Sequence, residues 1–321
     1  MSRMANMPNM PNMANMPNMP KKKRKISKLS RKGTFALLLL GLPGILYIFV
    51  FRYLPFYGII LPFKNFKPLQ GIFGSPWVGF KNFEFLFLTN LILRPTFNTI
   101  YMNLLFFTFN TVCGVALALL LYEVSSKAVK VYQTIYFMPY FLSWAIVALI
   151  VLGYLDSNGF VSHLLNMPAG FYNKPSYWPV ILIVVEVWKI LGYASLIYYA
   201  AVVAIDQTYF EAAAIDGANK LQRIRHVTLP SIMPMIVMIN LLALGGVFYG
   251  DAGLFYNVTQ NNALLYPTTD VIDTFVLRAL VRINDIGMSS AAGLYQSVCG
   301  LILVLASNLA ARKLSPDNAL F

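Results

Sequence analysis

Long apolar runs constrain this sequence more than any other feature. A helix needs about 20 apolar residues to cross the hydrocarbon core of a membrane, and six segments approach or exceed that length. They predict six transmembrane helices at Phe35–Phe51, Phe97–Tyr122, Gln133–Leu155, Trp178–Ala204, Ile232–Phe248 and Ala291–Ala311. Charged residues are 12% of the chain, against roughly 25% in a soluble domain. The sequence therefore predicts an all-α polytopic membrane protein.

Basic residues predict which loops face the cytoplasm. With a cytoplasmic N-terminus, 16 Lys and Arg residues lie inside, 8 lie outside and Lys189 lies within a span. The positive-inside rule favours this arrangement, most strongly through the basic run beside the first span. The long loop 52–94 weakens the signal because it carries five of the eight outside residues. Both termini and the loop 205–230 are therefore predicted to be cytoplasmic.

Residues 1–33 are predicted to form a disordered cytoplasmic tail, and residues 34–321 the transmembrane domain. Asn-Met-Pro units recur between Asn6 and Pro20, and prolines at that spacing prevent a helix or a strand. The basic run Lys21–Lys32 fits anionic membrane lipids better than nucleic acid. Copper binding is the alternative for the methionines, since thioethers are soft ligands, although no Cys or His lies nearby.

The polar loop 205–230, between the fourth and fifth apolar segments, carries local helix signals. Thr208 and Glu211 have the spacing of a capping box, which predicts a helix start. The three alanines that follow extend such a helix and leave room for another backbone, and Gly217 can end it in the left-handed conformation.

A second short helix is predicted from Lys220 to Val227, with Pro230 marking its end and the entry to the next span. Together the two helices predict a compact knob that another protein can dock against. A solvated connection with good caps is the alternative.

The knob sequence Glu-Ala-Ala-Ala-Ile-Asp-Gly-Ala at 211–218, with Thr-Leu-Pro at 228–230, resembles the EAA loop of ABC importer permeases. Val227 stands where the family usually has Ile, a small departure. Other segments resemble permeases of the oligosaccharide and polysaccharide branch: Gly44–Tyr47, Phe51–Pro55, Gly74–Phe80, Leu264–Thr274, Ala291–Gln296 and Arg312–Pro316. The likeness covers about Gly41 to Phe321, and the overall likeness favours an alginate importer permease.

The resemblance implies a type I importer fold in a bacterial cytoplasmic membrane. This subunit would pair with a second homologous permease, and two ATP-binding cassette subunits would bind ATP and Mg and dock on the loops. An extracytoplasmic solute-binding protein would deliver the oligosaccharide, which crosses by alternating access. The implied ATPase-coupling residues are Glu211, Ala212, Ala213, Ala214, Asp216, Gly217 and Ala218.

Polar and aromatic residues inside the apolar segments predict the substrate path, because polar groups are costly in hydrocarbon and usually face a cavity or a partner. Asn103 and Asn110 lie seven apart on one helix face, and Glu186 and Lys189 lie three apart. The candidates are Asn103, Asn110, Trp188, Glu186, Lys189 and Tyr193. A structural role is the equal alternative, since Asn can join helices and Glu186 can neutralise Lys189.

Signs of catalysis or metal binding are lacking in the sequence. Both cysteines fall in apolar spans, the two histidines lie in separate loops, and no Gly-x-x-x-x-Gly-Lys phosphate loop occurs. We therefore predict a transporter subunit and not an enzyme. An ion-gradient-driven secondary carrier is the alternative: it explains the hydropathy and Glu186, but it has no need of a capped cytoplasmic knob.

Overall fold

A computed structural model describes residues 31–314 of the chain. The Met-rich repeat and most of the basic run, both assigned to the tail, lie outside these residues. Within them all regular elements are helical, apart from an isolated β-bridge between Lys64 and Trp77. The described chain divides into two compact units between Tyr57 and Gly58.

The α-helices are α1 (Arg31–Ile48), α2 (Gly71–Gly74), α3 (Lys81–Leu88), α4 (Leu93–Tyr122), α5 (Ser126–Phe137), α6 (Trp144–Leu155), α7 (Phe160–Leu164), α8 (Trp178–Val203), α9 (Gln207–Ile215), α10 (Lys220–Arg223), α11 (Leu229–Leu244), α12 (Tyr266–Thr269), α13 (Ile272–Arg278) and α14 (Ile286–Leu314). Tighter or wider helical turns connect them, among them η5 (Met138–Phe141), η8 (Ile224–Thr228), η9 (Gly253–Val258) and η11 (Ala279–Ile283).

Six helical segments of the described chain are long and apolar enough to cross a membrane, so the predicted number is confirmed. Their bounds are Leu38–Phe63, Leu93–Tyr122, Trp144–Leu164, Pro175–Val203, Lys220–Leu244 and Ile286–Leu309.

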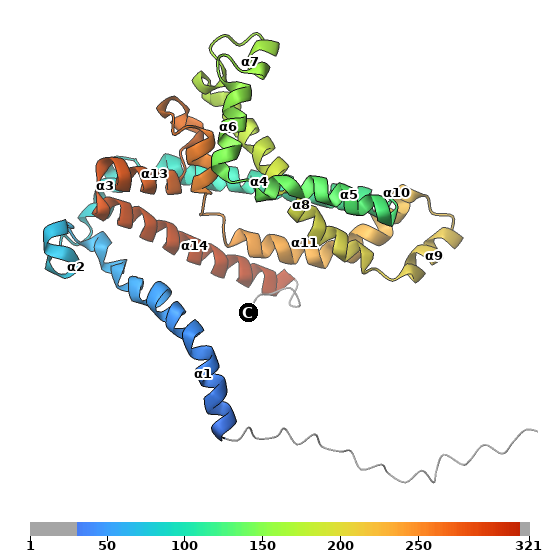
Figure 1. Cartoon of the computed structure of the whole chain (residues 1–321), viewed down its shortest axis with the longest axis horizontal. Coiled ribbons are helices and arrows are strands. Elements are labelled where there is room, and N and C mark those ends of the chain that lie inside the picture. The colour runs from blue at the N-terminus through green and yellow to red at the C-terminus, as the bar shows by residue number, and fades with distance from the viewer. Residues whose placement is uncertain (1–30, 315–321) are drawn as a thin grey trace, which may run out of the picture. The chain divides into compact units, whose positions relative to one another are not determined.

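The third predicted span, Gln133–Leu155, is wrong as a single helix. The chain changes direction at η5, between α5 and α6 (Figure 1). Pro139 lies in this turn and has no N–H for the helical ladder, while the hydroxyl of Ser143 caps the new helix by accepting from the N–H of Ile146. The sequence stays hydrophobic through the bend, so hydropathy alone does not reveal it.

Pro230 also behaves differently from the prediction. The helix that begins at Lys220 passes through η8 into α11 as one candidate span, Lys220–Leu244. Pro230 occupies the first turn of α11, where a missing N–H is tolerated, and the wider turn of η8 leads into it.

Three clusters of buried apolar side chains hold the second unit together. The first joins α4, α6, α8 and η9, with Trp178, Leu182 and Leu254 fully buried. The second joins α3, α13 and α14, and the third joins α4, α8 and α11. Because α4 and α8 contribute to two clusters and pack along each other, they form the axis of this unit.

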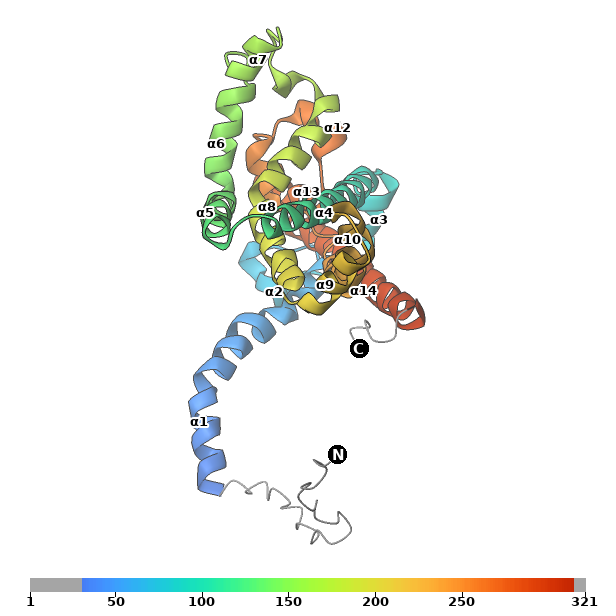
Figure 2. The ribbon, with the colours of Figure 1, turned by 90° about the vertical axis from the view of Figure 1, so that its right-hand side faces the viewer.

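The arrangement separates two ends of the second unit. In Figure 1, α9 and α10 lie at the right-hand end, while α3 and α13 lie at the left-hand end. A quarter turn shows α6 rising at the left of the view, with α7 at its upper end (Figure 2). The loop 205–230 is therefore well separated from the segments 81–88 and 272–278.

Candidate functional site

The knob of α9 and α10 starts two residues earlier than predicted. Asp206 caps α9, its carboxylate accepting from the N–H of Thr208 at 2.9 Å. The predicted capping box of Thr208 and Glu211 is therefore wrong, because Asp is a strong N-cap and the helix is already formed at Thr208. The same hydrogen bond holds the pKa of Asp206 below its ordinary value.

The end of α9 is as predicted. Gly217 has a φ of +76°, the left-handed conformation that favours glycine. Ala218 N–H donates to the carbonyl of Ala213, and Gly217 N–H donates to that of Ala214, the pattern of a Schellman cap. The reciprocal hydrogen bonds of Asn219 and Gln222 then cap α10, so both short helices are fixed by local contacts.

The surface of the knob is open. Glu211 is exposed, and so are the apolar side chains of Ile215, 87%, and Leu221, 73%. Exposed apolar side chains on a rigid, capped element are typical of an interaction surface. The predicted coupling residues 211–218 therefore lie on an accessible surface.

Three contacts connect the knob to the end of α4. Gln207 Nε2 donates to the hydroxyl of Tyr122 at 3.1 Å, and the rings of Tyr122 and Phe210 lie 5.8 Å apart. Lys220 Nζ forms an ion pair with Glu123 at 2.7 Å. This connection could not be predicted from the sequence, because the partners lie 85 to 97 residues apart.

The two asparagines of α4 that were predicted to line the substrate path, Asn103 and Asn110, differ in their surroundings. Asn103 Nδ2 donates to the carbonyl oxygens of Val247 at 3.0 Å and Tyr249 at 3.3 Å, and so joins α4 to the segment after α11. Asn110 lines a pocket of about 190 Å³ together with Tyr193 and Asn240. The structure thus brings Asn110 and Tyr193 together and places Asn103 in a packing contact.

Glu186 and Lys189 do not form the ion pair considered from the sequence. Lys189 Nζ donates to the carbonyl of Tyr140 at 2.9 Å and lies 5.0 Å from the ring of Trp144. Glu186 Oε2 is buried without a hydrogen-bond partner. Tyr140 stacks on Tyr193 at 5.1 Å, so the ammonium group and three aromatic rings gather between α8 and η5.

Two carboxylates beside these residues were missed as site candidates. Asp251 accepts a hydrogen bond from the indole N–H of Trp144. Asp273 accepts from Gly250 N–H at 2.6 Å and Gln296 Nε2 at 2.9 Å, and burial raises the pKa of its carboxyl. Neither carboxylate could be identified from the sequence as part of a site, because nothing local links position 251 to position 144.

Trp188 is 43% exposed on α8 and does not join the ring cluster around Lys189. Among residues 31–314, no three His, Cys, Asp or Glu side chains are placed to hold a metal ion.

Six apolar helices with an exposed, capped knob between the fourth and fifth define a multi-span permease. The model of the family described as "Binding-protein-dependent transport system inner membrane component" matches residues 111–316. The chain belongs to this family, the inner membrane permease subunits of ABC importers, which lack an ATPase site of their own.

Two relatives from Bacillus subtilis (strain 168) match over most of their length. Protein LplB is 31% identical to this chain, and the alignment covers 88% of this chain and 90% of LplB. The polygalacturonan/rhamnogalacturonan transport system permease protein YteP is 32% identical to this chain, and the alignment covers 88% of this chain and 89% of YteP.

A solved structure of a bacterial ABC transporter involved in the import of the acidic polysaccharide alginate contains a chain of the same fold. Its TM-score is 0.80 at 31% identity, covering 88% of this chain and 97% of the other. A second alginate transporter structure, in complex with an alginate pentasaccharide-bound periplasmic protein, gives a TM-score of 0.78 at 30% identity. The match covers 88% of this chain and 96% of the other. The predicted type I importer fold is confirmed.

Proposed function

We propose that this chain is the permease subunit of an importer that carries an acidic oligosaccharide, alginate being the leading candidate, across the cytoplasmic membrane by alternating access. The supporting observation is the exposed, doubly capped knob between two spans of a chain in this permease family. The relatives' names support the substrate class, since alginate is an acidic polysaccharide and polygalacturonan is a polymer of a uronic acid.

The proposed partners are a second homologous permease, two ATP-binding cassette subunits that bind ATP and Mg, and an extracytoplasmic solute-binding protein. The apolar side chains of Ile215 and Leu221 and the acidic Glu211 form the surface offered to an ATPase. Both termini would be cytoplasmic, on the same side as the knob. Movement of a docked ATPase would then pass into α4 through Tyr122 and Glu123.

The test is uptake of a labelled alginate trisaccharide by sealed vesicles that contain the whole importer. We expect uptake to need ATP on the knob side and loaded binding protein on the other. Glu211→Lys should abolish uptake while the protein remains inserted, because it reverses the charge of the docking surface. Glu84→Lys is the matched control, since Glu84 is an exposed acidic residue on α3.

Normal uptake by Glu211→Lys would count against the coupling assignment. Uptake by the purified single chain under an ion gradient, without ATP, would favour the secondary carrier instead.

A further inference from the structure

A polar pocket beside α6 is separate from the residues discussed so far. Its volume is about 320 Å³, and it lies where α6 packs against η9. Alanine and leucine side chains of α6 line one side, and the other lining residues are Tyr256, Asn257, Gln260, Asn261 and Arg282. The pocket thus combines an apolar wall, three carboxamides and one guanidinium group.

Asn261 is the best-defined group of this pocket. It is 8% exposed, and its side-chain oxygen accepts from the hydroxyl of Tyr266 at 2.9 Å. Its Nδ2 is buried and has no hydrogen-bond partner in the described chain. A buried donor without a partner destabilises the fold, so this amide is suited to meet an acceptor on a ligand.

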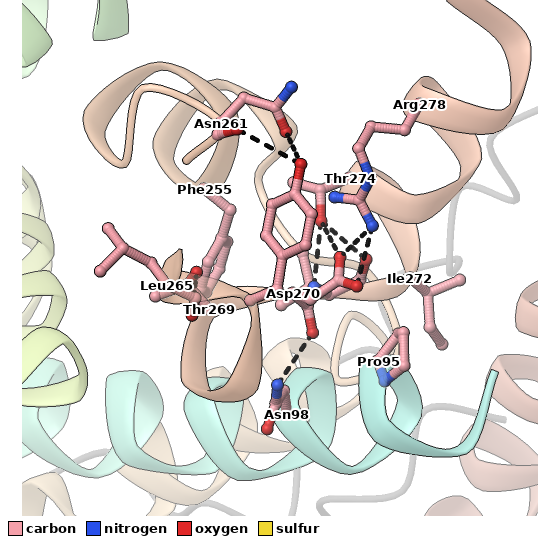
Figure 3. A network of polar contacts seen from close by, with 12 residues as sticks. Pro95, Asn98, Phe255, Asn261, Leu265, Thr269, Asp270, Ile272, Thr274 and Arg278 are labelled. Atoms are coloured by element: carbon pink, nitrogen blue, oxygen red, sulfur yellow. Dashed lines mark hydrogen bonds and ion pairs between the residues drawn. The ribbon is translucent and has the colours of Figure 1, made fainter. Parts of the chain in front are cut away.

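A buried network fixes the orientation of that amide (Figure 3). Arg278 donates to both carboxylate oxygens of Asp270, at 2.7 and 2.8 Å, and its guanidinium lies 4.1 Å from the ring centroid of Tyr266. Tyr266 in turn donates to Asn261. Because the oxygen of Asn261 is held by Tyr266, its nitrogen is turned away from the network.

The backbone at the pocket is also held in an uncommon form. Gln260 and Asn261 are consecutive residues with φ of 56° and 45°, a region rarely occupied by residues other than glycine. Asn261 N–H donates to the carbonyl of Tyr256, and Gln260 Nε2 donates to that of Asn257. Such conformations concentrate at binding and catalytic sites.

Arg282 gives the pocket its charge. It lies on η11, is exposed, and has no ion-pair or hydrogen-bond partner among residues 31–314. Arginine binds carboxylates in a bidentate manner, while carboxamides suit sugar hydroxyls. The apolar wall of α6 and the ring of Tyr256 suit the face of a sugar ring.

The geometry points to a subsite for one uronate unit of an oligosaccharide, with Arg282 on its carboxylate and Asn261 Nδ2 on a ring or hydroxyl oxygen. This inference rests on the proposed function and adds the residues that recognise the charge. The amides of Asn257 and Gln260 border the same sugar.

The test is direct binding of an alginate trisaccharide to the purified importer complex without ATP, compared with its neutral methyl ester. Arg282→Gln should weaken binding of the acidic sugar by about tenfold and leave binding of the ester nearly unchanged. Asn261→Asp keeps an oxygen for Tyr266 but replaces the donor, so it should weaken binding of both sugars. Arg94→Gln is the matched control, since Arg94 is exposed and lies outside the pocket.

Equal binding of both sugars by the wild type, or unchanged binding by Arg282→Gln, would overturn the subsite. Thermal unfolding of each variant complex checks that it is intact. The proposed function is judged separately by ATP-dependent uptake, so uptake without charge discrimination would remove the subsite and leave the importer. Charge-selective binding without ATP-dependent uptake would support the subsite and remove the proposed importer function.

Discussion

Single residues decide how closely the helices of this permease approach. Gly192 on α8 faces the backbone of α5, and a Cβ built there would lie 2.7 Å from Cα of Phe137. A Cβ built at Gly153 on α6 would have no atom within 4 Å. The two glycines therefore differ in packing although both lie inside apolar helices.

We expect Gly192→Ala to destabilise the protein by about 1–3 kcal/mol, because the added methyl group must push α5 away from α8. Gly153→Ala is the control and should be neutral or slightly stabilising, since alanine favours helices. The midpoint of thermal unfolding in detergent measures both. Equal midpoints for the two variants would show that α5 does not rest on Gly192.

A pH effect is expected at Asp273, whose carboxyl is partly buried. Burial raises its pKa above the ordinary 3.8, so the folded state holds this proton more tightly than the unfolded state. The contribution of Asp273 is therefore greatest below the ordinary pKa and is lost as pH rises through the raised value. Asp273→Asn should flatten this part of the stability curve, because the amide does not ionise.

The measurement is thermal unfolding from about pH 4 to about pH 7. Glu84→Gln, at an exposed carboxylate, should keep the wild-type slope. If Asp273→Asn also keeps the wild-type change of unfolding midpoint with pH, that change arises from other groups.

Between elements, the connection from α9 and α10 to α4 joins the proposed docking surface to a membrane span. It consists of one hydrogen bond, one ring contact and one exposed ion pair. An exposed ion pair contributes little to stability, so the aromatic contact and the hydrogen bond carry most of the connection.

Tyr122→Ala removes both of these contacts and leaves the docking surface unchanged. We expect ATP hydrolysis to persist while transport per ATP falls several-fold, because α4 no longer follows the knob. Tyr132→Ala is the matched control, at a tyrosine of α5 that is 44% exposed. Unchanged transport per ATP in Tyr122→Ala would show that the coupling runs through other contacts.

In the whole molecule, the family model matches residues 111–316, and the Met-rich repeat lies before the matched region. The repeat lies outside the residues that the structure describes. Its sequence lacks the apolar periodicity needed to pack against helices.

Deletion of residues 1–20 should therefore leave topology and uptake nearly unchanged. Neutralising the basic run Lys21–Lys32 should lower correct insertion, because juxtamembrane basic residues set orientation and attract anionic lipid by about 1 kcal/mol each. Cysteine-accessibility mapping and vesicle uptake measure both changes. A transport defect after loss of the repeat alone would show that the repeat is functional.

Apolar length and local caps were readable in the sequence, and most of the fold follows from them. The number of spans depends only on hydrophobic length, and the glycine cap of α9 depends on residues within one turn of Gly217. The bend before α6 was missed because Pro139 does not interrupt the hydrophobic run.

Contacts across the sequence required the tertiary structure. Helices that are apolar all round carry little periodicity, so their rotation cannot be predicted from the pattern. The roles of Asn103 and Lys189, the connection of Tyr122 to α9, and the amide of Asn261 all depend on that rotation or on partners from other elements. The polar side chains could be identified from the residues alone, but only packing decided which of them bond to backbone and which face a pocket.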